Sequence, residues 1–150
     1  MKKVFYFCLC IILLGSCKSQ KTVVSFTDLE GEWSVTELSG VDLAKADAKP
    51  KMSFNTAEKR MAADAGCNNI AGMAELTTSN PSAIKFTGVL ATRKFCLENM
   101  DKETALLKAL DKIESFGAGP VSPSAVAYVF YGAEKEKLFV IERAKVSAPQ

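Results

Sequence analysis

Histidine is absent from all 150 residues of the sequence. Its absence excludes Ser-His-Asp and Cys-His catalytic sets, and it excludes every zinc site that uses a histidine ligand. It also removes the side chain that most often changes charge near neutral pH. We therefore expect neither histidine-based catalysis nor a histidine pH switch.

Other catalytic and metal-binding patterns are also missing. No Cys-x-x-Cys spacing occurs, and Ser82-Ala83-Ile84-Lys85 matches the Ser-x-x-Lys pattern without its partner motifs. The glycines of residues 117–120 are not followed by the Lys-Ser/Thr of a phosphate loop. Acidic residues are scattered, without a pair that suits a two-carboxylate hydrolase. The sequence predicts no enzyme, no cofactor and no bound metal.

The sequence has no excess of positive charge once an N-terminal signal is removed. The chain has 19 basic and 17 acidic residues, but Lys2 and Lys3 precede an apolar run over residues 4–14 that is typical of a secretory signal. That run is too short to span a bilayer as a permanent helix. Removing residues 1–16 leaves 134 residues and 17 charges of each sign. Nucleic-acid binding is therefore not expected.

Cysteine is scarce, and its five positions divide by location. Cys8 and Cys10 lie inside the signal, Cys17 follows it, and Cys67 and Cys96 belong to the folded part. A pair of cysteines in an exported domain favours a disulfide. A nucleophilic Cys67 would have no histidine to activate it, and a thiolate metal site would lack suitable spacing. We therefore predict that Cys67 and Cys96 form a structural disulfide, which closes a loop of 28 intervening residues.

The segment Leu14-Gly15-Ser16-Cys17 resembles the lipobox of bacterial lipoproteins. The resemblance implies a diacylglyceryl thioether on Cys17 and an amino-terminal acyl chain such as palmitate. Several acyl chains together give stable membrane attachment. The alternative is an ordinary signal peptide followed by a chance cysteine.

We divide the chain into a signal peptide (1–16), a lipidated cysteine with a polar tether (17–27), a domain (28–144) and a tail (145–150). Lys18 stands where aspartate retains a lipoprotein at the inner membrane in well-studied systems. Its presence predicts anchoring in the outer membrane of the cell envelope, on the periplasmic side or at the cell surface. The expected partners are the membrane, through Cys17, and an envelope protein.

Alternating apolar and polar residues bounded by turn residues indicate short strands in the domain. The predicted strands are residues 33–38, 51–55, 60–64, 72–76, 83–87, 89–96, 125–131 and 137–143. Residues 41–50 and 116–124 are expected to be loops, and Gly88 is expected to interrupt the sheet. Trp33, the only tryptophan, is expected in the core rather than as a ligand platform.

The stretch Gly66-Cys67-Asn68-Asn69-Ile70-Ala71-Gly72 is the most distinctive of the sequence. Its glycines can adopt positive φ, and its asparagines tolerate left-handed conformations and bond to nearby backbone. We expect a structured corner between two strands. Ligand binding by Asn68 and Asn69 is the less favoured alternative.

One helix is predicted, over about residues 99–114. Asn99 is placed as its N-cap, and Asp101 and Glu103 suit its first turn. Leucines 106, 107 and 110 and Ile113 recur at helical spacing and define one apolar face. The fold class is therefore mainly β (α+β), a small antiparallel sheet of about eight strands, strongly curved or barrel-like, with one packed helix.

Several of these segments together resemble the META domain family of HslJ-like bacterial lipoproteins. They are Leu29-x-Gly31-x-Trp33, Pro50-x-x-x-Phe54, Gly66-Cys67-Asn68-Asn69-x-x-Gly72, Thr92-Arg93-Lys94-Phe95-Cys96 and the closing strand 138–143. Lys94-Phe95 and Ala74 depart from the usual pattern. The resemblance implies a barrel-like β fold with a helix, at the cell envelope, and links to heat-shock, drug-resistance and motility phenotypes. It implies no enzymatic activity and no binding residues.

Two functions fit these observations. The first is a non-enzymatic envelope accessory or stress-related lipoprotein that contacts another protein, which predicts a filled barrel and an exposed apolar patch. The second is a small-molecule binding protein that uses a lipocalin-like barrel mouth near Tyr128, Phe130 and Tyr131. We favour the first, because about eight short strands enclose only enough room for side chains.

Overall fold

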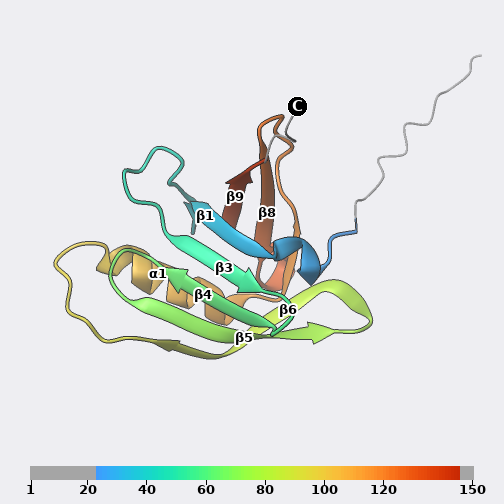
Figure 1. Ribbon diagram of the computed structural model, residues 1–150, viewed down its shortest axis with the longest axis horizontal. Helices are drawn as coiled ribbons and strands as arrows, with labels where there is room; N and C mark the ends of the chain where they lie inside the picture. The colour runs from blue at the N-terminus through green and yellow to red at the C-terminus, as the bar shows by residue number, and fades with distance from the viewer. Residues whose placement is uncertain (1–22, 146–150) are drawn as a thin grey trace, which may run out of the picture.

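The structure is a computed structural model that describes residues 23–145 of the chain. Nine strands, one α-helix and two short 3-10 helices make up the described part (Figure 1). In chain order they are η1 (Phe26–Leu29), β1 (Gly31–Leu38), β2 (Val41–Asp42), β3 (Lys51–Asn55), β4 (Arg60–Asp64), β5 (Asn69–Thr77), β6 (Asn80–Ala91), α1 (Met100–Lys112), β7 (Ser115–Ala118), β8 (Ala125–Tyr131), η2 (Ala133–Lys135) and β9 (Lys137–Ala144).

Eight of these strands form a closed antiparallel barrel. Their order around the ring is β1-β3-β4-β5-β6-β7-β8-β9, and β9 closes the ring by pairing with β1. The two-residue strand β2 lies outside this ring and pairs with the end of β1. The predicted fold class, a small barrel-like β fold with one packed helix, is confirmed.

The β3–β4 hairpin has the bounds that its sequence pattern predicts. Met52 and Phe54 on β3 and Met61 and Ala63 on β4 point into the core and alternate with more exposed neighbours. This alternation is the period-2 pattern of a strand with one buried face. In the turn, Asn55 accepts a hydrogen bond from a backbone N–H two residues before Arg60, which stabilises the connection.

Two strand predictions need correction on either side of α1. Residues 83–87 and 89–96 do not form separate strands, because β6 runs continuously from Asn80 to Ala91 and residues 92–96 lie outside any strand. Gly88, with φ +59°, lies in a register shift between β5 and β6 and bends the strand without ending it. Part of the expected loop 116–124 belongs to strand β7. The eight strands of the barrel are therefore not the same eight that the sequence predicted.

The start of the barrel also differs from its predicted boundary. Val24 and Phe26, which the sequence places in the tether, are each only 4% exposed and belong to the core. Phe26 packs edge-on against Phe54, with 6.2 Å between ring centroids. The folded domain therefore begins before residue 28, within the range 17–27 that the sequence assigned to the tether.

Helix α1 covers one opening of the barrel and contacts β1, β6 and β9. Leu106 and Leu110 are fully buried and Ile113, just beyond the helix, is 2% exposed, as the spacing predicts. Asn99 occupies the N-cap position, but it has φ +66° and its side chain does not cap the helix. Its Oδ1 accepts a hydrogen bond from Lys102 Nζ instead.

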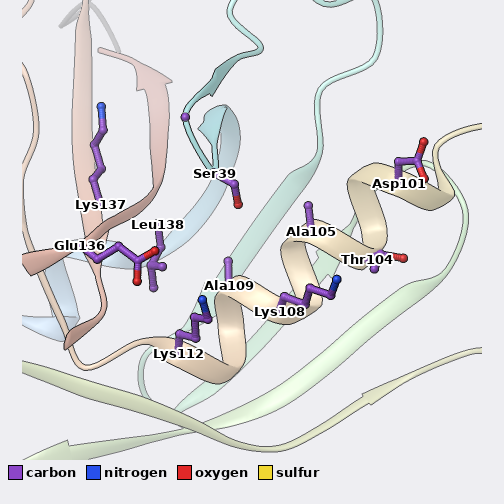
Figure 2. A pocket seen from close by; sticks show the side chains of 11 residues that line it. Ser39, Asp101, Thr104, Ala105, Lys108, Ala109, Lys112, Glu136, Lys137 and Leu138 are labelled. Carbon is purple, nitrogen blue, oxygen red and sulfur yellow. The ribbon is translucent and has the colours of Figure 1, made fainter.

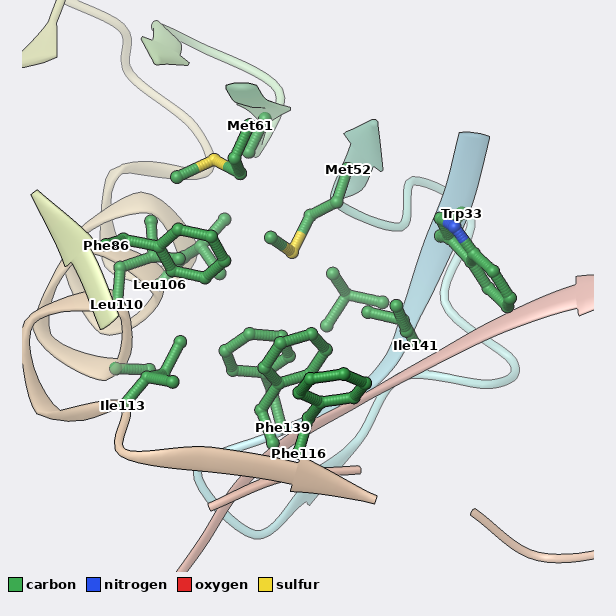
Figure 3. Close-up of a cluster of buried hydrophobic side chains, with 14 of the residues drawn as sticks. Trp33, Met52, Met61, Phe86, Leu106, Leu110, Ile113, Phe116, Phe139 and Ile141 are labelled. Carbon is green, nitrogen blue, oxygen red and sulfur yellow. The ribbon is translucent and has the colours of Figure 1, made fainter. Parts of the chain in front are cut away.

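Aromatic rings fill the barrel interior (Figure 3). Phe130 is fully buried and stacks on Phe139, Phe116 and Phe54, with centroid distances of 4.6, 5.8 and 6.2 Å. Trp33 is 2% exposed and donates from Nε1 to a backbone carbonyl at 2.6 Å, which confirms its predicted place in the core. Stacked rings at these distances contribute beyond their buried area.

Candidate functional site

The corner between β4 and β5 contains the distinctive motif of the sequence. Gly66 adopts φ +96°, and its N–H donates to Asp64 Oδ1 at 2.6 Å, which forms the expected tight turn. Gly72, Asn68 and Asn69 do not adopt positive φ, contrary to the conformational argument made from the sequence. Among the residues of this motif, Gly66 alone has a left-handed backbone conformation.

A disulfide joins this corner to the segment that leads into α1. Cys67 and Cys96 are bonded, with their Cα atoms 5.9 Å apart and 29 positions apart in the sequence. Both residues are half-buried. The bond ties residues 92–99, which lie outside any regular element, to the barrel wall.

Asn68 holds the same segment by hydrogen bonds and is itself 4% exposed. Its Oδ1 accepts from Thr92 Oγ1 at 2.8 Å and from the Lys94 N–H at 2.7 Å. Its Nδ2 donates to the Lys94 carbonyl at 3.3 Å. The carboxamide thus pairs with both backbone groups of one residue, as a neighbouring strand would.

Glu103 on the first turn of α1 completes this arrangement. Glu103 is only 9% exposed. One of its carboxylate oxygens accepts a hydrogen bond from the Asn68 N–H at 2.9 Å, and the other accepts one from Asn68 Nδ2 at 3.0 Å. Two donors from one residue thus satisfy both oxygens of this buried carboxylate. Asn68 and Glu103 therefore lock the corner, residues 92–96 and α1 together.

The roles of Asn68 and Glu103 were only partly visible in the sequence. Asn68 is structural, as preferred over ligand binding, but it acts through partners 24 to 35 positions away and not through its own turn. Glu103 was assigned only a favourable place in the first helical turn. A sequence signal for this pairing is absent, since both residues suit local roles that need no distant partner.

The outer side of the same segment carries two exposed apolar side chains among exposed polar ones. Phe95 and Leu97 are 84% and 93% exposed, and they flank Cys96, whose side chain turns inward to the disulfide. Leu90 is 75% exposed and Met100 is 44% exposed. We call Phe95 and Leu97, the two of these side chains that lie within residues 92–99, the apolar segment. Sequence reasoning missed it, although two large apolar residues around a bonded cysteine in a polar stretch could have indicated it.

A surface groove runs between α1 and the barrel rim at the β1–β2 turn and the start of β9 (Figure 2). It has a volume of about 590 Å³, and Lys108 and Lys112 of α1 face it together with Lys137 and Glu136 near the start of β9. Lys137 is paired with Glu37 at 2.6 Å. Charges of both signs on a solvated wall give this groove no defined chemistry.

Two ionisable groups have shifted pKa values. Hydrogen bonds from the Thr56 side chain and N–H, at 2.6 and 2.7 Å, lower the pKa of Glu30. Burial raises the pKa of Tyr128, and the negative charge of Asp28 adds to that effect. Glu30 precedes β1 and Tyr128 lies on β8, so neither belongs to the disulfide corner; hydrogen bonds cause the first shift and burial is the main cause of the second.

Other kinds of site can be assessed only for residues 23–145. Within this range, no three histidine, cysteine or acidic side chains gather in a way that could hold a metal ion. The same range contains no helix long and apolar enough to cross a membrane. Cys17, the predicted lipidation site, and the signal peptide before it lie outside the described residues.

The fold and this corner place the chain among small closed antiparallel β-barrels with a single helix across one opening. Residues 25–120 match the family model of the META domain, and the chain therefore belongs to the META domain family, as its motifs predicted. The chain is also similar in fold to the NMR structure of a protein from Burkholderia xenovorans. That match has a TM-score of 0.54 at 19% identity and covers 81% of this chain and 86% of the other. No curated protein matches the sequence.

Proposed function

We propose that this protein is a non-enzymatic lipoprotein of the cell envelope that acts by contact with another envelope protein, in an accessory or stress-related role. Cys17 carries the lipid anchor, and residue 18 directs the chain to the outer membrane. The META domain is then held at the membrane by a short polar tether.

One observation carries the proposal of protein contact. The barrel interior is filled with stacked rings, whereas large apolar side chains are exposed on a segment that a disulfide and a buried polar pair hold in place. Exposed apolar side chains that gather on one surface are typical of protein interaction sites. The filled interior also argues against a lipocalin-like binder, because Phe130 of the expected barrel mouth is fully buried.

The lipid anchor is tested by labelling cells with radioactive palmitate. The wild-type chain and a Cys10→Ser variant are expected to incorporate label, because Cys10 lies in the signal that is removed. A Cys17→Ser variant is expected to lose the label and to leave the membrane fraction. Equal labelling of the Cys17→Ser variant contradicts the anchor.

The mode of action is tested on the anchored chain in its own envelope. Mild crosslinking in intact cells followed by purification is expected to recover one protein in reproducible amounts. Native mass spectrometry of the purified chain, without its lipid, is expected to show the bare polypeptide mass. A small molecule retained at one per chain, with no protein recovered, overturns the proposal in favour of ligand binding.

A further inference from the structure

We infer that the Cys67–Cys96 disulfide is a site of thiol–disulfide exchange, which a dithiol opens at Cys96 while the chain stays folded. Opening the bond loosens residues 95–98 and leaves the barrel intact. The disulfide therefore acts as a redox-sensitive switch for the order of one loop. This inference goes beyond the proposed function and does not depend on it.

The disulfide is the main link that holds residues 95–98, in the loop that leads from β6 into α1 (Figure 1). Among the described residues, no backbone or side-chain hydrogen bond reaches any of these four positions. Packing adds little, because Phe95 is 84% and Leu97 is 93% exposed. The order of this stretch therefore depends on the bond between the two sulfurs.

Fixed points that involve no sulfur lie on either side of the stretch. Before it, Asn68 Oδ1 accepts a hydrogen bond from the Lys94 N–H at 2.7 Å. After it, the Glu103 N–H donates to the Asn99 carbonyl and Lys102 Nζ donates to Asn99 Oδ1, each at 3.1 Å. Breaking the disulfide thus frees a short loop between two fixed ends, which is a local opening and not an unfolding of the domain.

The two sulfurs have different surroundings. Cys67 Sγ accepts a hydrogen bond from Asn68 Nδ2 at 3.4 Å and lies 3.7 Å from the Lys94 carbonyl oxygen. Within residues 23–145, no such neighbour is found for Cys96 Sγ, and the other residues of 92–98 are all exposed. Access decides which sulfur of a disulfide is attacked, so a reductant reaches Cys96 first.

The exchange proceeds in two displacements. A thiolate of the dithiol attacks Cys96 Sγ and forms a mixed disulfide, and the electron pair of the broken bond goes to Cys67 Sγ. The Asn68 amide already donates to this leaving sulfur, which needs no histidine to depart. The second thiol of the dithiol then displaces Cys96. The dithiol ends as a disulfide, and the chain has gained two electrons and two protons.

The same surroundings keep reduced Cys67 in place. Its sulfur takes up a proton and, as a thiol, has the Lys94 carbonyl as its acceptor. The Glu103 carboxylate is bonded to the same Asn68 amide and opposes a second lasting negative charge there. Reduction therefore leaves Cys67 fixed at the corner and Cys96 on a free loop.

The first test is the rate at which dithiothreitol reduces the purified full chain, with and without urea below the unfolding transition. We expect a rate proportional to the dithiothreitol concentration that changes less than about twofold with urea, because the opening is local. If reduction instead required global unfolding, the rate would rise about fivefold or more for each molar of urea. That result would overturn the inference.

The second test identifies the sulfur that is attacked. The oxidised chain is treated with glutathione and quenched in acid, and its cysteine peptides are mapped by mass spectrometry. We expect about tenfold more glutathione on Cys96 than on Cys67, because Cys96 is the accessible sulfur. Equal labelling, or an excess on Cys67, would refute the assigned direction of exchange.

The third test compares amide NMR spectra of the oxidised and reduced chains. We expect changes confined to residues 95–98 and to the neighbours of the two cysteines, with the strands of the barrel unaltered. Loss of dispersed signals throughout would show that the disulfide is required for the fold. Unchanged signals at 95–98 would show that it does not control the loop. Either outcome contradicts the inference.

Two reduced variants form a matched pair for the fixed point at Lys94. In Asn69→Ala the changes should stay within residues 95–98, whereas in Asn68→Ala they should spread to residues 92–94. Identical spectra of the two would deny Asn68 its role. If Asn68→Ala does not fold, the three wild-type measurements still decide. None of them involves a partner protein or the lipid, so their failure leaves the proposed function standing.

Discussion

The Asn68–Glu103 pair makes a quantitative prediction about stability. Asn68→Ala removes the side-chain hydrogen bonds with Thr92, Lys94 and Glu103, one of which reaches a buried carboxylate. The charged bond is worth about 1.5–3 kcal/mol and each of the three neutral ones about 0.5–1 kcal/mol, since their partners can reach water. We expect the free energy of unfolding to fall by about 4 kcal/mol, a large share of a small domain's stability.

The measurement is urea unfolding of the oxidised chain, followed by circular dichroism. Asn69→Ala is the matched control, because Asn69 is adjacent and exposed and its side chain makes no hydrogen bond within residues 23–145. That variant should change the free energy of unfolding by less than about 0.5 kcal/mol. Equal effects of the two alanines would refute the network as a source of stability.

Glu103→Gln separates the charge from the shape of the side chain. Asn68 presents two donors to Glu103, whereas glutamine offers one acceptor and one amide donor. One buried donor is then left facing another, at a cost of about 2 kcal/mol. In an Asn68→Ala background the cost should shrink to below about 1 kcal/mol, because the side-chain donor is gone, and additive effects would show that the two residues are not coupled.

Three further predictions concern the disulfide and the shifted pKa values. Replacing both Cys67 and Cys96 by alanine should lower the free energy of unfolding by about 3.5 kcal/mol, as measured by the same urea titration. NMR titration should find the Glu30 pKa below its ordinary value in the wild-type chain and closer to that value in Thr56→Val. Because the pKa of Glu30 is lower in the folded than in the unfolded chain, its contact with Thr56 stabilises the fold above the unfolded pKa. This stabilisation is lost as pH falls through the folded pKa. In spectrophotometric titration, the tyrosine ionisation at the highest pH should disappear in Tyr128→Phe. Because the pKa of Tyr128 is raised in the folded chain, its contribution to the free energy of unfolding is present below the unfolded pKa and is lost as pH rises above that value.

Strand bounds were predictable where local chemistry alone decides them. The β3–β4 hairpin follows from alternating residues and a turn rich in polar side chains, and both signals act within fifteen residues. The buried face of α1 follows from helical spacing in the same way. In these elements the neighbours in sequence are also the neighbours that fix the structure.

Predictions failed where pairing across the barrel overrides local pattern. Ser115–Ala118 has weak strand character and becomes β7 because β8 pairs with it along its length. On β1, Val35 and Leu38 are both buried although they are three positions apart, because a register shift between β1 and β9 breaks the alternation that local pattern leads one to expect of a strand. Gly88 reads locally as an interruption, yet pairing with β5 continues beyond it.

The candidate site shows the same limit for side chains. The disulfide was predictable because a pair of cysteines has few other structural roles in a domain whose sequence predicts export. The partners of Asn68 were not, because the asparagine in such a corner already has a sufficient local explanation. The exposure of Phe95 was not predicted, because phenylalanine is among the residue types most often fully buried.

The folding unit extends beyond the residues that match the family. The match ends at residue 120, but β8 and β9 follow it and supply the pairings with β7 and β1 that close the ring. They also contribute Phe130, Phe139 and Ile141, each with 0% exposure, at the centre of the aromatic stack. Without these strands the barrel would be open on two edges and its core uncovered. The rigid attachment of the apolar segment therefore depends on strands far from it in sequence, because α1, which anchors that segment through Glu103, packs against β9.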